Sequence, residues 1–325
     1  MRTKAAQEST RIAATDAILA LMDADPRVTL VVADSLLVIK GSPIVDKYPE
    51  RVVEVGISEQ NGVDVAAGLA SAGMRPIFAT YAGFITMRAC EQVRTFVGYS
   101  NLDVKLIGAN GGIGGGEREG PTHQFIEDIG ILRTIPGMTV VVPADAAQVR
   151  AAVAAVASKR GPAYVRIGSG RDPVVYESPV EFELGKARIV NELGSDVAIF
   201  ACGSVLLRAM EAVEELRGDG IKATLVDVHT VKPIDVDTVA GVAARCGSAV
   251  TVEDHNIIGG LGSAVAETIC ENEPVPLERI GVRDTFARSG TPDELLDQYE
   301  IGVSHIVAAA KRAMARGASR RVAAR

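Results

Sequence analysis

The stretch VEVGISEQNGVDVAAGLASAG (53–73) leads from a short apolar strand into a helix. The strand is predicted over 51–55 and the helix over 59–72, where abundant Ala and Gly would let the helix lie close on a sheet. One carboxyl, that of Glu59, stands where the helix begins. An acid at this place commonly caps free N–H groups or complements the helix dipole, so Glu59 alone does not identify a site.

The same alternation of strand and helix extends on both sides of this stretch. Short apolar runs predict further strands at 28–34, 76–81, 104–110, 138–144 and 163–167. Helical spacing of apolar residues predicts helices at about 10–22 and 83–97, and another between the last two strands. Strands that alternate with helices imply right-handed crossovers, so we expect an α/β fold with a mostly parallel sheet.

The pattern changes after residue 172, where prolines and charged residues replace the apolar runs. A second α/β pattern starts near residue 195 and ends in one long helix predicted from about Thr291 to Ala315. We therefore expect a first domain over 1–172, a linker over 173–194 and a second domain over 195–325. The basic tail after the last helix is expected to fray.

Composition and charge exclude several classes of function. The 325 residues carry a formal net charge of −7, which argues against nucleic-acid binding. The N-terminus lacks the apolar core of a signal peptide, and no stretch approaches the length of a membrane span. The four cysteines form no CxxC pair and lie in apolar segments, which indicates a reducing compartment. We expect a cytoplasmic protein that binds neither membranes nor nucleic acid.

The motif GISEQN followed by AAGLA resembles the pyrimidine-binding domain of the transketolase family. Related motifs occur in deoxyxylulose-phosphate synthases and in the beta chains of 2-oxoacid dehydrogenases. The resemblance continues, in the same order and spacing, through 76–94, 112–148 and 253–267. It implies a thiamine-diphosphate pyrimidine-binding domain followed by a transketolase C-terminal α/β domain.

This resemblance implies a catalytic and cofactor-binding role for Glu59. In the family, the acid at this position hydrogen-bonds N1′ of the cofactor's aminopyrimidine and drives the 4′-amino group toward the imino form. The imino group then takes the proton from C2 of the thiazolium ring, and the cofactor serves as an electron sink. Asp would be one methylene too short for this geometry.

Three more residues match cofactor contacts of the family. The aminopyrimidine ring stacks on an aromatic residue at the position of Phe84, and Tyr81 matches a second aromatic residue nearby. Met87 stands where many members carry a third aromatic residue, which predicts a looser pocket on that side. Asp34 matches an acid that helps to position the cofactor, although a strand-end helix cap would explain this residue equally well.

The substrate side of the family's site falls on GEREGPTHQ (116–124) and on the strand before it. His123 matches an imidazole that reaches the reacting carbons of the substrate and can exchange protons near neutral pH. Glu119 replaces the usual Asp that contacts the C2 hydroxyl of the sugar. Asn110 falls near a second substrate histidine of the family, so one imidazole is missing.

Other motifs are less specific. Sugar-phosphate enzymes of the family place an arginine near Arg166 and Arg171, but neither matches it cleanly, and the partner chain is a further candidate for binding phosphate. The glycines of GGLGSA (259–264) lack the spacing of a nicotinamide site. Asp254 and His255 precede them, and one hypothesis for these two is contact with the partner chain or with the mouth of the active site.

The chain lacks the family's metal-binding motif in a suitable place. Thiamine diphosphate needs a divalent cation held by oxygen ligands, which the family supplies from a GDG motif and a later Asn in an N-terminal domain. Gly218-Asp219-Gly220 lies in the second domain without that Asn, so we assign no metal ligand. Because the first-domain pattern starts within thirty residues of Met1, we expect a complete chain of a split enzyme. A separate N-terminal subunit would hold Mg²⁺ and the diphosphate, in a heterotetramer.

The predicted function is therefore that of the C-terminal subunit of a two-chain transketolase. It would transfer a two-carbon ketol unit between a ketose and an aldose, with phosphorylated sugars favoured as substrates. Three alternatives stay open: the beta subunit of a 2-oxoacid dehydrogenase, a deoxyxylulose-phosphate-synthase-like enzyme and a non-catalytic assembly subunit. The GPTHQ motif argues against the first of them.

Overall fold

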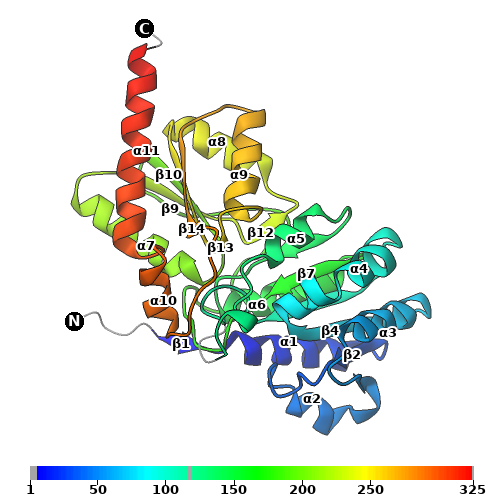
Figure 1. Cartoon of the computed structure of the whole chain (residues 1–325). Coiled ribbons are helices and arrows are strands. Elements are labelled where there is room, and N and C mark those ends of the chain that lie inside the picture. Colours follow the sequence, from blue (N-terminus) through cyan, green and yellow to red (C-terminus); the bar gives the residue numbers. More distant parts are fainter. Residues whose placement is uncertain (1–5, 116–118, 324–325) are drawn as a thin grey trace.

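The structure is a computed structural model that describes residues 6–115 and 119–323 (Figure 1). The strands of its first half are β1 (Gln7–Glu8), β2 (Val28–Val32), β3 (Val52–Glu54), β4 (Arg75–Tyr81), β5 (Lys105–Ala109), β6 (Thr139–Val141), β7 (Ala163–Arg166) and β8 (Asp172–Pro173). The helices between them are α1 (Thr10–Ala24), α2 (Ser42–Lys47), α3 (Glu59–Ser71), α4 (Cys90–Gln92), α5 (Asp128–Thr134) and α6 (Ala146–Ser158).

The second half repeats the alternation of strands and helices. Its strands are β9 (Arg188–Glu192), β10 (Val197–Ala201), β11 (Ala223–Asp227), β12 (Thr230–Lys232), β13 (Ala249–Asn256) and β14 (Leu277–Val282). Its helices are α7 (Leu206–Gly218), α8 (Val236–Cys246), α9 (Leu261–Glu271), α10 (Pro292–Gln298) and α11 (Val303–Ala323). No helix of the described chain combines the length and apolarity needed to cross a bilayer.

Two sheets organise the molecule. The first has the strand order β12-β6-β7-β5-β4-β2-β3 and the second the order β14-β13-β10-β11-β9. All neighbours are parallel except β12 against β6 and β9 against β11. β2, β5 and β10 are buried along their whole length, as continuous apolar runs in a covered parallel sheet should be. The predicted α/β fold with mostly parallel sheets is confirmed.

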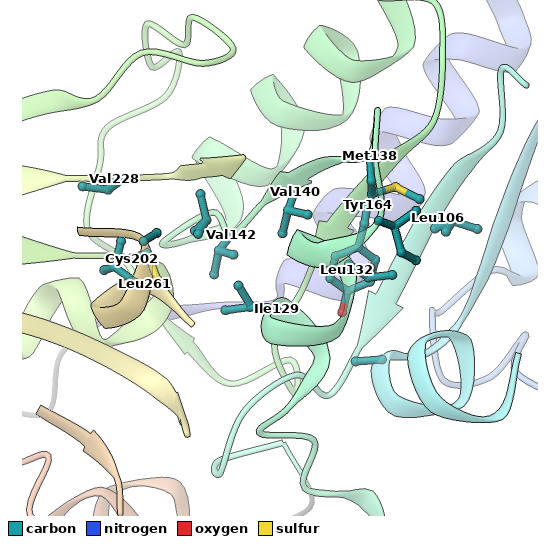
Figure 2. Packing of buried hydrophobic residues seen from close by; sticks show 14 of the residues in the cluster. Leu106, Ile129, Leu132, Met138, Val140, Val142, Tyr164, Cys202, Val228 and Leu261 are labelled. Carbon is teal, nitrogen blue, oxygen red and sulfur yellow. The ribbon is translucent and has the colours of Figure 1, made fainter. Parts of the chain in front are cut away.

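Helices cover both faces of each sheet. In the first sheet, α1 and α6 pack on one face, and α3 and α5 pack on the other. In the second sheet, α7 and α11 cover one face, and α8 and α9 cover the other. The α3–α5 face of the first sheet and the α8–α9 face of the second share one apolar cluster. Figure 2 shows part of this cluster, which extends through Leu106, Tyr164, Met138, Leu132, Val140, Ile129, Val142, Leu261, Cys202 and Val228.

The two halves are therefore joined by a continuous core and by a shared strand. β12 comes from the second half of the chain but pairs with β6 at the edge of the first sheet, with Thr230 opposite Val141. An edge strand that is paired in this way exposes no free backbone groups on that side. The shared strand fixes the orientation of the second domain on the first.

The C-terminal region differs from the sequence prediction. Instead of one helix from Thr291 to Ala315, the chain forms α10 and α11, separated by a turn in which Glu300 has φ +62°. A left-handed residue cannot continue an α-helix, and this explains the break. Most of the basic tail continues α11, which extends to Ala323 at the outer side of the second domain (Figure 1). Residues 324–325 of the tail lie outside the described residues.

A buried polar network lies where the two domains meet. Arg166 at the end of β7 is only 5% exposed, and its Nε lies 3.0 Å from Oδ2 of Asp128. Its Nη2 donates to the carbonyl oxygens of Phe125 and Asp254 at 3.1 and 2.8 Å. The Tyr164 hydroxyl donates to the same Asp128 oxygen at 2.7 Å. The guanidinium thus links the first sheet to β13 of the second domain.

Arg166→Met should lower the free energy of unfolding by about 3–5 kcal/mol, because it leaves the Asp128 charge buried without its cation. Urea unfolding of both proteins measures the difference. Arg160→Met removes an exposed cation just before the same strand and serves as the control, with an expected change within about 0.5 kcal/mol. Equal losses in the two variants would show that the network adds no stability.

His255 at the end of β13 is fully buried in the same region, so its predicted place at a partner interface or site mouth is wrong. Its Nε2 accepts a hydrogen bond from the Gly130 N–H at 3.2 Å, and Nδ1 lies 2.6 Å from the carbonyl oxygen of Asn256. Asp254, its neighbour, accepts from the Ile113 N–H at 2.6 Å. Burial lowers the pKa of His255 to about 4.

The sign of the resulting pH dependence follows from proton binding. Between pH 6.5 and 4 the unfolded chain protonates His255 and the folded chain does not, so this group makes stability fall as the pH falls. Glu253 has the opposite effect on the pH dependence, because burial raises its pKa to about 7. The contribution of Glu253 to the free energy of unfolding is therefore lost as the pH rises through 7. The two groups partly cancel in the wild-type protein.

His255→Gln should therefore destabilise the protein less at pH 5 than at pH 7, by about 2 kcal/mol, since Gln has no proton to gain. Chemical unfolding at both pH values gives the two differences. An equal loss of stability at pH 5 and pH 7 would contradict the lowered pKa of this histidine.

Candidate functional site

The candidate site lies at the carboxyl edge of the first sheet. Asp34 follows β2, Tyr81 ends β4 and Asn110 follows β5. Glu59 begins α3, a few residues after β3. Because these strands are parallel neighbours, their carboxyl ends meet on one side of the sheet, where open α/β sheets bind ligands. The predicted residues of four separate segments are thus brought to one edge.

Glu59 is the most buried acid of this edge, with 1% exposure at the first position of α3. Its two carboxylate oxygens each accept a hydrogen bond from Nη1 of Arg88, both at 2.8 Å. A buried carboxylate needs such compensation, because an unpaired charge away from water is costly. The carboxyl therefore points toward Arg88 and does not cap its own helix.

Phe84 lies next to this ion pair. The guanidinium carbon of Arg88 sits over the Phe84 ring at 4.0 Å from its centroid. Edge contacts join the Phe84 ring to Tyr81, His123 and Phe125, with centroids 5.4, 5.3 and 5.2 Å away. One face of the ring is thus covered by a cation, and other aromatic rings hold it in place.

The helix that carries Phe84 and Arg88 is not regular. The sequence predicted one helix from 83 to 97, whereas the structure has π-helical turns at η2 (Phe84–Arg88) and η3 (Val93–Tyr99) around the short α4. π-helical turns are rare and occur often at functional sites. Here Phe84 and Arg88 lie at the two ends of the wide turn, and the Arg88 guanidinium lies over the Phe84 ring.

His123 comes from a separate segment and reaches the same aromatic group. It ends η4 (Pro121–His123), a turn that follows Gly120 with φ +76°. The half-buried imidazole packs edge-on against Tyr81 at 5.0 Å, and its Nδ1 lies 3.0 Å from the Thr122 hydroxyl. The structure thus brings Glu59, Phe84, Tyr81 and His123 together.

Asn110 is buried behind this group in the left-handed conformation, with φ +58° and 2% exposure. Its side-chain oxygen accepts a hydrogen bond from the Arg11 guanidinium, whose Nε also donates to the Gly168 carbonyl at 3.4 Å. Arg11 lies near the start of α1, and sequence reasoning did not select it. The amide of Asn110 is therefore oriented by an arginine of α1, which lies 99 residues earlier in the sequence.

Glu119 and Asp34 lie on the exposed rim. Residues 116–118 of the motif that contains Glu119 lie outside the described residues. Burial, and secondarily the negative charge of Glu119, raises the pKa of Tyr81. Asp34 has φ +51°, and its backbone N–H donates to Oε1 of Glu54 at 2.7 Å.

The two arginines considered for a substrate phosphate have different surroundings. Arg166 is buried and engaged with Asp128 and two carbonyl oxygens, so its guanidinium serves the domain junction. Arg171 is exposed and lines a groove of about 540 Å³ between the domains, together with Gly114, Gly115 and other residues. Of the two, Arg171 has the accessible side chain.

The site has the chemistry to accept an aminopyrimidine. The Arg88 guanidinium, a flat group rich in N–H donors, already lies on the Phe84 ring and donates to Glu59. A planar aminopyrimidine could use the same two contacts, one by stacking and one by hydrogen bonding. The residues therefore fit this half of thiamine diphosphate.

The metal site is not found in the described residues, which contain no cluster of three or more His, Cys, Asp or Glu side chains suited to a metal ion. Asp219 of the Gly-Asp-Gly sequence follows α7, and its carboxylate pairs with Lys311 at 2.8 Å. A carboxylate that is engaged by a lysine on the outer face of the second domain cannot serve a site at the edge of the first sheet.

Comparison with known proteins matches both domains. Residues 6–170 match the family model of the transketolase pyrimidine-binding domain, and residues 185–306 match that of the transketolase C-terminal domain. The chain belongs to the transketolase family. The resemblance inferred from GISEQN and the later motifs is thereby confirmed.

Relatives and solved structures agree with this assignment. The chain is 41% identical to the 6-deoxy-6-sulfo-D-fructose transketolase subunit SqwH of Clostridium sp. (strain MSTE9), with 91% of each chain covered. It is 38% identical to one of the subunits of the apulose-4-phosphate transketolase of Phocaeicola vulgatus, covering 88% of this chain and 91% of that protein. The solved structure of a split-gene transketolase, an inactive beta4 tetramer, matches 96% of this chain and 100% of its own, with 38% identity and a TM-score of 0.87. The prediction of a split-transketolase subunit is confirmed.

Sequence reasoning missed Arg88, although a signal was present. Arg88 follows Phe84 by four residues, and on an α-helix this spacing puts two side chains on one face. A cation on the same face as the proposed stacking ring, close to a buried acid, is a candidate partner for that acid. Arg11 gave no comparable signal, because 99 residues separate it from Asn110.

Two glycines of α3 offer a matched test of how the helix that carries Glu59 is placed. A Cβ on Gly62 would lie 2.6 Å from the Phe78 ring on β4, whereas a Cβ on Gly68 would meet nothing within 4 Å. Gly62→Ala should destabilise the protein by about 1–3 kcal/mol, and Gly68→Ala should stabilise it by up to about 1 kcal/mol. Thermal unfolding of the two variants gives the comparison, and a loss at both positions would show that close packing is not the reason for Gly62.

Proposed function

We propose that this chain is the pyrimidine-binding half of a two-chain transketolase that transfers a two-carbon ketol unit from a ketose to an aldose. The observation that carries the proposal is the arrangement of Glu59 and Phe84, a buried carboxylate beside a ring face where a flat N–H donor already lies. This is the arrangement that an aminopyrimidine requires, and it occurs in a chain of the transketolase family.

Glu59 would activate the cofactor. Thiamine diphosphate supplies the carbon nucleophile and the electron sink when it is bound. The carboxyl of Glu59 would hold a proton against N1′ of the aminopyrimidine, from within a pocket that excludes water. Phe84 would fix the ring plane by stacking, and Tyr81 would support Phe84 through its edge contact at 5.4 Å. Asp34 would help to position the cofactor from the adjacent loop.

The substrate would bind on the His123 side of this pocket. Because His123 packs against both Phe84 and Tyr81, its imidazole lies beside the place where the reacting carbons would be held. It would hydrogen-bond hydroxyl or carbonyl oxygens and move protons to and from them. Glu119 on the rim and Asn110, oriented by Arg11, would contact further hydroxyls of the sugar.

The far end of the sugar would carry an anionic group. The two relatives are named for a sulfonated ketose and for a ketose phosphate. Arg171 is the arginine with an accessible side chain in the interdomain groove, and it would meet such a group. Arg166 would act at a distance, by holding the domain junction in place.

The partner would be an N-terminal subunit that carries the diphosphate-binding domain and Mg²⁺, in a heterotetramer. Exposed apolar side chains near the site support a covering partner: Ile57 is 74% exposed and Met87 44%. Ile57 and Met87 lie within three residues of Glu59 and Phe84, so a partner that covers them would also close the pocket.

Glu59→Gln should reduce ketol transfer at least about 100-fold, because Gln keeps the shape of the side chain but has no acidic proton to share. The assay combines this chain with its partner subunit, thiamine diphosphate, Mg²⁺ and a panel of ketose phosphates. Glu91→Gln, an exposed acid on α4, is the control and should keep activity within about twofold.

Activity of the Glu59→Gln complex at the wild-type level, or transfer by this chain alone, would contradict the proposal. Decarboxylation of a 2-oxoacid in place of ketol transfer would favour a dehydrogenase-type or deoxyxylulose-phosphate-synthase-like reaction. Assembly with the partner but no turnover on any substrate would favour a non-catalytic role.

A further inference from the structure

Arg88 makes the same two contacts that the proposed function assigns to the aminopyrimidine. Its guanidinium lies over the Phe84 ring at 4.0 Å from the centroid, and its Nη1 donates to both oxygens of Glu59 at 2.8 Å. One face of a phenyl ring holds one flat group at a time, and here the guanidinium on that face also engages both carboxylate oxygens. The arginine and the aminopyrimidine therefore compete for one place.

The two members of the ion pair differ in their freedom to move. The Glu59 side chain is 1% exposed, whereas that of Arg88 is 46% exposed. Long arginine side chains keep the charged group near water while the stem lies along apolar surface. Arg88 can therefore turn outward into solvent, whereas Glu59 at the start of α3 stays where the helix puts it.

We propose that Arg88 is an internal occupant of the pyrimidine site, which leaves as thiamine diphosphate enters. This inference rests on the proposed function, since it takes Glu59 and Phe84 as the pyrimidine contacts. In the cofactor-free chain, Arg88 neutralises the buried carboxylate and covers the aromatic face. On loading, the aminopyrimidine takes over both contacts and the guanidinium moves to solvent.

The consequence is a weaker apparent affinity for the cofactor. A ligand that binds only when the site is open has its affinity reduced by the fraction of molecules with an open site. Because the Arg88–Glu59 pair is buried at one end, we expect the closed form to predominate by about tenfold. Arg88 thus stabilises the cofactor-free site and is displaced when the cofactor binds.

The test measures cofactor binding in the assembled two-chain complex by calorimetric titration with thiamine diphosphate in the presence of Mg²⁺. Arg88→Ala removes the occupant and should tighten binding about tenfold. Arg94→Ala is the matched control: it removes an exposed arginine from η3, which follows α4, and should leave the dissociation constant unchanged. Unchanged or weaker binding in Arg88→Ala would overturn the inference, and weaker binding would make Arg88 a cofactor ligand.

A second measurement, on this chain alone, does not depend on the cofactor. Arg88→Ala leaves the Glu59 charge buried without its partner, so the melting temperature should fall, and adding Glu59→Gln should restore most of the loss. Absence of this rescue would show that the pair does not stabilise the empty chain and would also overturn the inference.

Phe84→Ala separates failure of the inference from failure of the proposed function. If Phe84→Ala weakens cofactor binding but Arg88→Ala does not tighten it, the pyrimidine site stands and Arg88 is not its occupant. If Phe84→Ala leaves cofactor binding unchanged, the pyrimidine site lies elsewhere, and both the proposed function of these residues and the role of Arg88 fail.

Discussion

A carboxylate that is buried at the start of a helix needs a partner, and much of the candidate site follows from that need. Glu59 has 1% exposure, so its charge must be met by a cation or by a group that shares a proton. In this chain Arg88 meets it, and the wide helical turn from Phe84 to Arg88 makes the contact possible. A flat molecule with a nitrogen directed at the carboxyl would meet the same need, and this is the basis of the proposed function.

Close packing elsewhere in the fold sets the positions of the site residues. Gly62 lets α3 lie against Phe78 of β4, which sets the position of Glu59 relative to the end of that strand. A Cβ on Gly83 would overlap the ring of Phe125, the residue that supports Phe84 from behind. Phe125 in turn accepts a hydrogen bond from Arg166, which also reaches the second domain. Packing between the domains thus extends to the aromatic group of the site.

Most of the fold and part of the site could be predicted from the sequence. Apolar runs placed the strands because buried parallel strands are apolar on both faces, and the motifs selected Glu59, Phe84, Tyr81 and His123. The break at Glu300 was missed because helical spacing continues across a left-handed residue, and the burial of His255 was missed because it depends on contact between domains. The domain limits at 172 and 195, and the roles of the site residues, remain predictions.

We propose that Glu59 and Phe84 form the pyrimidine site and that Arg88 gives way to the cofactor. A crystal structure of the two-chain complex with thiamine diphosphate and Mg²⁺ tests it most directly. We expect N1′ at about 2.6–3.2 Å from the Glu59 carboxyl, the aminopyrimidine on the Phe84 ring, and the Arg88 guanidinium turned to solvent. A cofactor bound elsewhere, with Arg88 still on Glu59 and Phe84, would contradict it.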